Sequence, residues 1–249
     1  MKLIAVLLIV LLSACATTDA QQGELQIKPL TDDVYLHTSY KWLEGIGYYP
    51  SNGLILVDNG NAFIIDTPWL EEDTVRLVEW LKNAGLTLKG SISTHFHDDR
   101  SSGISYLNEL GVDTYASTQT NELLASTGSA TATMEFSTTP HMLGDTQLEA
   151  YYPGAGHSKD NIVVWLPQSR VLFGGCLVRS LNTQSMGNTA DGSVPDWAQS
   201  VLRAKERYFA ARHVVPGHGA VGGQELLDHT IRLAKARALV DQQAATSRK

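Results

Sequence analysis

The order of strand-like and helix-like segments constrains the fold of this chain most, because the same order occurs in both halves. Each half opens with short runs rich in β-branched and aromatic residues, bounded by Asn, Gly and Asp, and continues into helical patterns. The strand-like runs are DVYLHTSY, NGLILVD and NAFIIDT in the first half and QLEAYYP, NIVVWLP and RVLFGG in the second. Two groups of strands, each covered by helices, pack as two sheets face to face with the helices outside. The sequence therefore predicts an α/β chain of four layers, an αββα sandwich.

Turn and capping residues set the approximate limits of these elements. Asn59-Gly60 is a strong signal for a hairpin turn between two strands. The first helix, in LEEDTVRLVEWLKNAG, carries acidic residues in its first turn and stops at Gly85. A second helix is expected to begin near Ser101 and to end before Gly111. Further helices are expected at 119–126, 196–208 and 224–244, and further strands in KGSIS and HVVPGHG.

The composition favours a single soluble domain. The chain has 249 residues, of which 43% are apolar, and this is enough for one large domain with a buried core. The formal net charge is −7 without a long block of like charge, so the sequence carries no electrostatic footprint for nucleic acid. We find no internal repeat, low-complexity tract or interdomain linker in the sequence. Nothing in the pattern requires a dimer, and we expect a monomer.

The N-terminus has the pattern of an export signal. Lys2 precedes an apolar run at 3–12, followed by small residues, and this run is shorter than the ~20 residues of a membrane span. LSAC resembles a bacterial lipobox, in which Cys15 receives lipid, although Ala14-Cys15-Ala16 also fits the cleavage site of a soluble periplasmic protein. No Asp follows Cys15, which favours the outer membrane. We predict an export signal with lipobox at 1–15, a short tether at 16–24 and one domain at 25–249.

The stretch THFHDDR crowds histidines and aspartates directly after a predicted strand. In an extended segment alternate residues share one face, so His95, His97 and Asp99 would point the same way and Asp98 elsewhere. Imidazole and carboxylate are ligand types that suit zinc. The alternative is a polar, solvated loop.

Three more potential ligands lie in glycine-rich loops at strand ends. They are His157 in GAGHSKDN, Cys176 in FGGCLVRS and His218 in PGHG. Glycine lets the backbone approach a site closely, and loops of this kind often carry functional side chains. The alternative for Cys176 is a small, buried and inert thiol. The sequence assigns no role to the other four histidines, which are His37, His141, His213 and His229.

Taken together, these residues resemble the class B metallo-β-lactamases of the first subclass. The resemblance rests on His95, His97, Asp99, His157, Cys176 and His218 and runs over nearly the whole mature chain, through IIDTPW, GAGHSKDN and VVPGHG. Glyoxalase-type and nuclease-type hydrolases share the His-X-His-X-Asp motif. They usually place His after the Asp and a bridging Asp in place of the cysteine, whereas here Arg100 follows Asp99. The second subclass alters the first histidine and the third lacks the cysteine ligand.

The resemblance implies two zinc ions and a hydrolytic reaction. One zinc is held by His95, His97 and His157, and the other by Asp99, Cys176 and His218. Zinc-bound hydroxide would attack the β-lactam carbonyl without an acyl-enzyme, and the substrates would be penicillins, cephalosporins and carbapenems. The serine route has no support, since S-x-x-K does not occur.

The resemblance also implies substrate contacts. Arg179, where many members carry Lys, would pair with the substrate carboxylate. Asn188 would donate to the carbonyl oxygen, with a plain turn residue as the alternative. Trp42, or its apolar neighbour Ile46, would cover the substrate from a flap, with ordinary packing as the alternative. Asp99 and Asn188 would be the catalytic side chains.

Two further side chains are expected to support the ligands from behind. Arg100 would orient Asp99 or Cys176, and Asp66 would receive the outer N–H of a ligand histidine. Two other functions remain open on the sequence alone. One is a thioester or phosphodiester hydrolase on the same fold, and the other is a lipid-anchored zinc-binding protein without activity.

Overall fold

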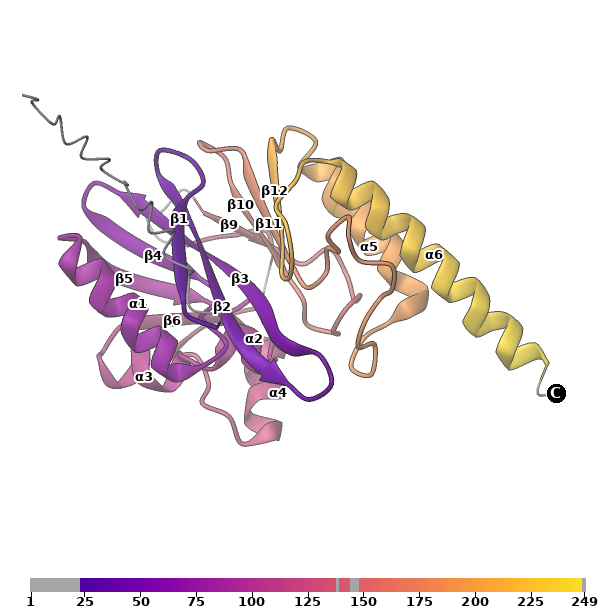
Figure 1. The fold of residues 1–249 in the computed structure, drawn as a ribbon, viewed down its shortest axis with the longest axis horizontal. Coiled ribbons are helices and arrows are strands. Elements are labelled where there is room, and N and C mark those ends of the chain that lie inside the picture. The colour runs from indigo at the N-terminus through magenta and orange to yellow at the C-terminus, as the bar shows by residue number, and fades with distance from the viewer. Residues whose placement is uncertain (1–22, 138, 144–147, 248–249) are drawn as a thin grey trace, which may run out of the picture.

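The computed structural model describes residues 23–137, 139–143 and 148–247. Two β-sheets lie face to face, and helices cover the outer face of each (Figure 1). This is the predicted αββα sandwich. The predicted export signal and Cys15 lie outside the described residues, as does the predicted tether apart from Gly23 and Glu24. Within the described part, no helix combines the length and the apolar character needed to cross a membrane.

The first sheet has seven strands in sequential order, from β1 to β7. The first four strands pair antiparallel, and β4 to β7 pair parallel. The predicted hairpin turn between β3 and β4 is confirmed: Asn59 and Gly60 both have positive φ, as this turn class requires. The strands are β1 (Gln26–Pro29), β2 (Val34–Leu43), β3 (Gly47–Asp58), β4 (Asn61–Ile65), β5 (Thr87–Ile92), β6 (Asp113–Ser117) and β7 (Met134–Phe136).

The second sheet has five strands in the order β12-β11-β10-β9-β8. All neighbours are antiparallel except β11 and β12, which run parallel. The strands are β8 (His141–Met142), β9 (Glu149–Tyr151), β10 (Val163–Leu166), β11 (Val171–Gly175) and β12 (His213–Pro216).

The helices are α1 (Glu71–Asn83), α2 (Asp98–Ser101), α3 (Ile104–Glu109), α4 (Thr118–Thr127), α5 (Val194–Arg207) and α6 (Glu225–Thr246). The helix expected between Ser101 and Gly111 is α3, which begins three residues later than expected, and the short helix α2 before it was not expected. The chain breaks between the two at Gly103. The N–H of Gly103 donates to the hydroxyl of Thr67, 2.9 Å away, instead of continuing the helix. A β-carbon at Gly103 would also overlap the side chain of Thr74.

Alternation along the strands divides the apolar residues among three layers. Leu54 and Leu56 face the interior between the sheets, where they meet Phe173 and Val215 of the second sheet. Ile55, between them in sequence, faces the opposite way and packs against α1. On the far side, Trp197 and the apolar faces of α5 and α6 cover the second sheet. Both sheets are therefore rigid supports for the loops at their ends.

Candidate metal centre

Six potential ligands converge where strands of both sheets end. His95 and His97 follow β5, Asp99 lies on α2, and His157 lies in the loop between β9 and β10. Cys176 directly follows β11, and His218 follows β12. The structure brings all six residues of the predicted ligand set into one region.

Three histidines form the first group. The distance from His95 Nε2 to His97 Nδ1 is 3.1 Å, and the distance from His97 Nδ1 to His157 Nε2 is also 3.1 Å. The ligand atoms of all three lie within 4.8 Å of one another. Burial lowers the pKa of His157 to about 3 and that of His95 well below its usual value, with neighbouring histidines adding to both shifts. Both rings therefore present neutral nitrogen lone pairs, the form that binds zinc.

A carboxylate, a thiol and an imidazole form the second group. Asp99 Oδ2 lies 3.2 Å from His218 Nε2 and 3.5 Å from Cys176 Sγ, and the latter two atoms are 3.3 Å apart. Burial lowers the pKa of His218, but the neighbouring Cys176 and Asp99 outweigh burial and raise it to about 10. Two acidic ligands thus draw positive charge to this point, which suits a divalent cation.

Asp99 reaches the site by a different route from the one expected. The extended-chain argument is wrong in its geometry, because β5 ends at Ile92 and Asp99 lies on the helical turn α2. The choice between the two aspartates still holds. Asp98 borders the cleft in an exposed ion pair with Lys41 at 3.4 Å and contacts none of the other potential ligands, among the contacts of the described residues, whereas the Asp99 side chain is only 8% exposed and lies beside Cys176 and His218.

Hydrogen bonds fix which nitrogen of two histidines faces the site. His218 Nδ1 donates to the carbonyl oxygen of Pro50 at 2.6 Å, which leaves Nε2 for a metal. His97 Nε2 donates to Asp191 Oδ2 at 3.0 Å, which leaves Nδ1. No pattern in the sequence pointed to Asp191, because it lies in an irregular loop 94 residues after His97.

Arg100 connects the second group to Asp66 by hydrogen bonds. Its side chain is fully buried, and Nη2 donates to Asp99 Oδ2 at 2.8 Å and to Cys176 Sγ at 3.1 Å. Nη1 donates to Asp66 Oδ2 at 3.3 Å. Although burial opposes it, the charge of Arg100 and a hydrogen bond from His218 hold the pKa of Asp99 well below its usual value. Arg100 thus contacts both of the ligands that it was predicted to orient.

Asp66 has a different partner from the one expected. Its carboxylate accepts from the backbone N–H of Thr94 at 2.6 Å and from the Thr94 hydroxyl at 2.8 Å, rather than from a ligand histidine. Burial raises the pKa of Asp66 to about 7, against the opposing influence of Arg100. Asp66 therefore supports the site through Thr94, next to His95, and through Arg100.

Four of the six potential ligands, His97, Asp99, His157 and His218, line a cleft of about 690 Å³, whereas His95 and Cys176 do not line it. The cleft is large enough for a small organic molecule. Side chains from the β2–β3 hairpin and from the loops that follow β4, β5 and β11 complete the wall. They include Lys41, Ile46, Tyr49, Trp69, Phe96, Arg179 and Asn188. Arg179 is only 8% exposed, and its backbone N–H donates to the hydroxyl of Thr230 on α6 at 2.8 Å. Asn188 is exposed, and its Oδ1 accepts from the N–H of Ala190 at 3.0 Å.

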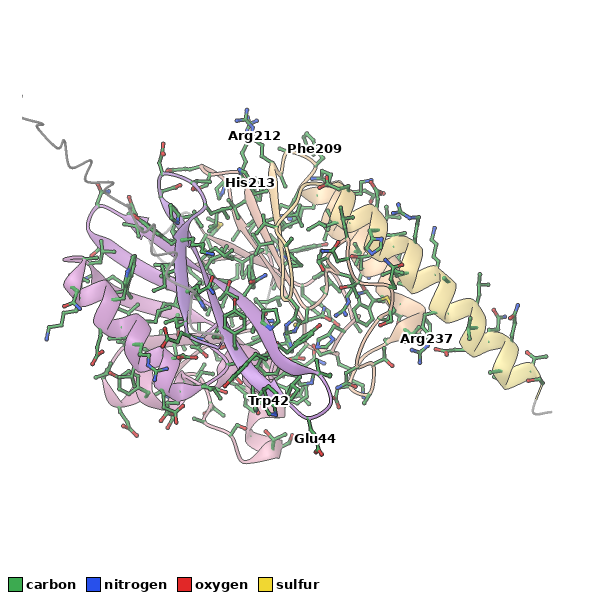
Figure 2. The ribbon with its side chains drawn as sticks, in the orientation of Figure 1. Trp42, Glu44, Phe209, Arg212, His213 and Arg237 are labelled. Carbon is green, nitrogen blue, oxygen red and sulfur yellow. The ribbon has the colours of Figure 1, made fainter. Side chains whose placement is uncertain are left out.

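Trp42 does not line this cleft. It lies near the tip of the β2–β3 hairpin, beside Glu44 (Figure 2), and is 64% exposed. Its ring packs edge-on against Tyr48, and both border a separate hollow of about 430 Å³ on the other face of the hairpin. Alternation along β2 turns Lys41 toward the cleft and Trp42 away. Ile46 borders both hollows and is the apolar flap residue closest to the prediction.

The four histidines without an assigned role do not line the cleft. His213 lies at the opposite end of the molecule from Trp42 (Figure 2). His141 stacks on Phe136, and His229 donates to the carbonyl oxygen of Thr183 at 2.8 Å. His37 is buried beside Asp66.

Comparisons with known proteins agree on one family. A metallo-β-lactamase type 2 from Pseudomonas aeruginosa is 37% identical over 230 residues, 92% of each protein. The crystal structure of the metallo-β-lactamase DIM-1 exposed to ceftazidime matches with a TM-score of 0.85 and 45% identity, covering 87% of this chain and 99% of that one. FIM-1 from Pseudomonas aeruginosa in its mono-zinc form gives 0.82 and 34% identity, covering 86% and 96%. A scan of family models gave no match.

A two-sheet sandwich with paired groups of zinc-type ligands beside a cleft defines a metal-dependent hydrolase. Within that class, the chain belongs to the class B metallo-β-lactamase family. The family resemblance and the αββα fold predicted from the sequence are both confirmed.

Proposed function

We propose that this protein hydrolyses the amide bond of β-lactam antibiotics with two zinc ions, and that it thereby confers resistance to them. The substrates are penicillins, cephalosporins and carbapenems. The observation that carries the proposal is the convergence of six potential donor atoms, in two groups of three, beside the 690 Å³ cleft, which four of the six residues line. The mixture of three histidines with an Asp, Cys and His set favours the first subclass.

The residues present fit zinc. His95, His97 and His157 would hold one ion, and Asp99, Cys176 and His218 the other, each with a position left open. Zinc in these positions polarises the carbonyl oxygen and lowers the pKa of water toward neutral. The Cys176 ligand would be a thiolate, for which Arg100 already donates a hydrogen bond.

The protein side chains bind and orient the substrate. Arg179 would pair with the carboxylate of the fused ring. Asn188 would donate from its amide nitrogen to the β-lactam carbonyl oxygen, since its own oxygen is held by Ala190. The Asp99 carboxylate belongs to the second group, and its oxygen also lies within 4.8 Å of a ring nitrogen of His95 in the first. It would accept a hydrogen bond from the attacking water. Water adds to the carbonyl carbon, the C–N bond breaks, and the ring nitrogen takes up a proton, with no acyl-enzyme.

The β2–β3 hairpin would cover the bound substrate as a lid. Ile46 already borders the cleft, and Trp42 would reach the substrate only after the hairpin bends toward it. A tryptophan that is 64% exposed on a two-stranded tip with glycines at 45 and 47 is suited to such a movement.

We further propose that the protein is exported and works in the periplasm as a monomer, anchored to the outer membrane by lipid on Cys15. Only the N-terminal sequence pattern supports the anchor. Replacement of Cys15 by Ser should move active enzyme from the membrane fraction to the soluble periplasmic fraction. Unchanged membrane association of that variant would refute the anchor.

The function is tested by offering the zinc-loaded mature domain a chromogenic cephalosporin and a glutathione thioester in parallel. A β-lactamase opens the cephalosporin and leaves the thioester intact. Cleavage of the thioester alone would point to the hydrolase alternative. Zinc binding without turnover of either would point to a metal carrier.

A further inference from the structure

His37 is a buried titratable side chain that the proposed chemistry does not use. It lies on β2, is 1% exposed, and its Nε2 lies 2.9 Å from the backbone carbonyl oxygen of Asp66. Burial lowers the pKa of His37 to about 4, so the ring is neutral near pH 7. A neutral ring has one N–H, and a carbonyl oxygen can only accept, so Nε2 donates to Asp66.

Asp66 has a backbone conformation that needs support. Its φ is 59°, in the left-handed region that residues with a β-carbon rarely adopt. Its N–H donates to the carbonyl oxygen of Ile92 at 2.8 Å, and its carbonyl accepts from His37. These two bonds hold the peptide groups on either side of the strained residue. They thereby set the direction of the Asp66 carboxylate.

Through Arg100, the direction of the Asp66 carboxylate affects the second ligand group. Asp66 Oδ2 lies 3.3 Å from Nη1 of Arg100, whose Nη2 donates to Asp99 and Cys176. Toward the three-histidine group, the side-chain hydrogen bonds of Asp66 within the described part of the chain go to Thr94, the neighbour of His95. Arg100 therefore links His37 more directly to the second group than to the first.

Gly53 on β3 supplies an independent observation. It lies opposite His37 in the antiparallel register of β2 and β3. A β-carbon at this position would overlap Nε2 of His37 and would lie 2.7 Å from the carbonyl oxygen of Asp66. Only glycine leaves room for the bond between His37 and Asp66.

We propose that His37 is a positioning residue for the ligand group of Asp99, Cys176 and His218, acting through the Asp66 carbonyl and Arg100. This role rests on the metal set of the proposed function. Losing the donor lets the Asp66 peptide relax, and Arg100 then loses its fixed position against Asp99 and Cys176. Supporting partners of this kind typically change metal affinity by about 10-fold to 100-fold.

The experiment compares two amides that differ by one methylene. In His37→Gln the amide nitrogen stands near the position of Nε2 and can still donate to Asp66, whereas in His37→Asn it is too short to reach. Zinc affinity of each group is measured by competition with a chromophoric chelator. Cobalt is substituted for zinc in parallel, and the thiolate-to-cobalt absorption reports whether Cys176 is a ligand.

We expect His37→Asn to weaken zinc at the second group by roughly 10-fold and to reduce the thiolate-to-cobalt absorption. The first group should change by less than the second. His37→Gln should restore most of both signals. Gly53→Ala should reproduce the loss, and its effect should not add to that of His37→Asn, because both remove the same bond.

Leu81→Ala is the matched control, since it opens a cavity behind the same sheet without touching this network. It should lower Tm and leave zinc affinity unchanged. Equal affinities of the Gln and Asn variants at the second group would overturn the proposed role. So would a control that loses zinc to the same extent as His37→Asn. A wild-type protein that never binds a second zinc would instead overturn the metal set, and the positioning role with it.

Discussion

Replacing Arg100 with Met should destabilise the apoprotein by about 3 kcal/mol at pH 7, a magnitude that follows from its surroundings. Arg100 is fully buried and is a cation beside Asp99 at 2.8 Å and Asp66 at 3.3 Å. Removing one member of a buried ion pair leaves the other charge uncompensated and typically costs about 3–5 kcal/mol. We expect the lower end of that range for two reasons. Protonated His218, with its pKa of about 10, remains 3.2 Å from Asp99, and Asp66 can take up a proton because its pKa is already about 7.

The protonation of Asp66 also sets how the loss of stability in Arg100→Met depends on pH. In the Arg100→Met variant, Asp66 loses the cation that opposes protonation, so the folded variant holds this proton more firmly than the folded wild type. As the pH falls from 7 to 5, the folded variant binds more protons than the folded wild type, and the difference in stability between them should shrink.

The assay is urea denaturation with a chelator present, followed by circular dichroism at pH 7 and pH 5. Arg237→Met is the control, because it removes an exposed pair with Asp241 at 2.8 Å, and such pairs contribute about 0.3–0.5 kcal/mol. An Arg100→Met variant whose stability at pH 7 matches that of the control would refute the reasoning.

Three further predictions follow from single residues. Cys176→Ser should abolish the thiolate-to-cobalt absorption while leaving metal at the three-histidine group, and metal-binding stoichiometry checks this. Arg179→Ala should raise KM for β-lactams by about 10-fold to 100-fold, which corresponds to the free energy of a hydrogen bond to a charged group. The change in kcat should be smaller, and Arg179→Lys should restore part of the lost affinity. The wild-type apoprotein should lose stability from His37 as the pH falls from 6.5 to about 4, because the folded pKa is depressed and the unfolded chain takes up the proton first. His37→Gln should remove that part of the slope in urea denaturation at a series of pH values.

The convergence of the six potential ligands could be predicted from the sequence because their residue types are uncommon, their settings are distinctive and together they resemble one family. His157, Cys176 and His218 each stand in a glycine-rich loop at the end of a strand, where packing alone gives no reason for them. The extended-chain geometry that pointed to Asp99 does not apply in the folded protein. A four-residue helical turn, too short to show periodicity in the sequence, delivers it to the site.

The supporting residues were harder to predict, because tertiary contacts determine their roles. Asp191 has no periodic neighbourhood, and only the folded loop brings it to His97. His37 looks like any polar residue on a half-buried strand until its contact with Asp66 is known. The side of the hairpin that Trp42 faces depends on the register of β2 against β3, which hydrophobic pattern does not fix in a strand pair with aromatic residues on both faces.

The sandwich could be predicted from the alternating strand and helix patterns of the sequence. The break in the helix at Gly103 could not. A glycine inside a helical pattern is usually tolerated, and the contact with Thr67 that ends α2 lies 36 residues away in sequence. The export signal and the lipid on Cys15 stay predictions.

The central claim is tested most directly by measuring hydrolysis of a carbapenem and a chromogenic cephalosporin by the purified mature domain before and after chelation. Zinc is then titrated back while bound metal is counted. The account predicts that turnover of both substrates disappears with the chelator and returns as zinc fills the two ligand groups. A protein with zinc in both groups that opens neither ring would contradict it.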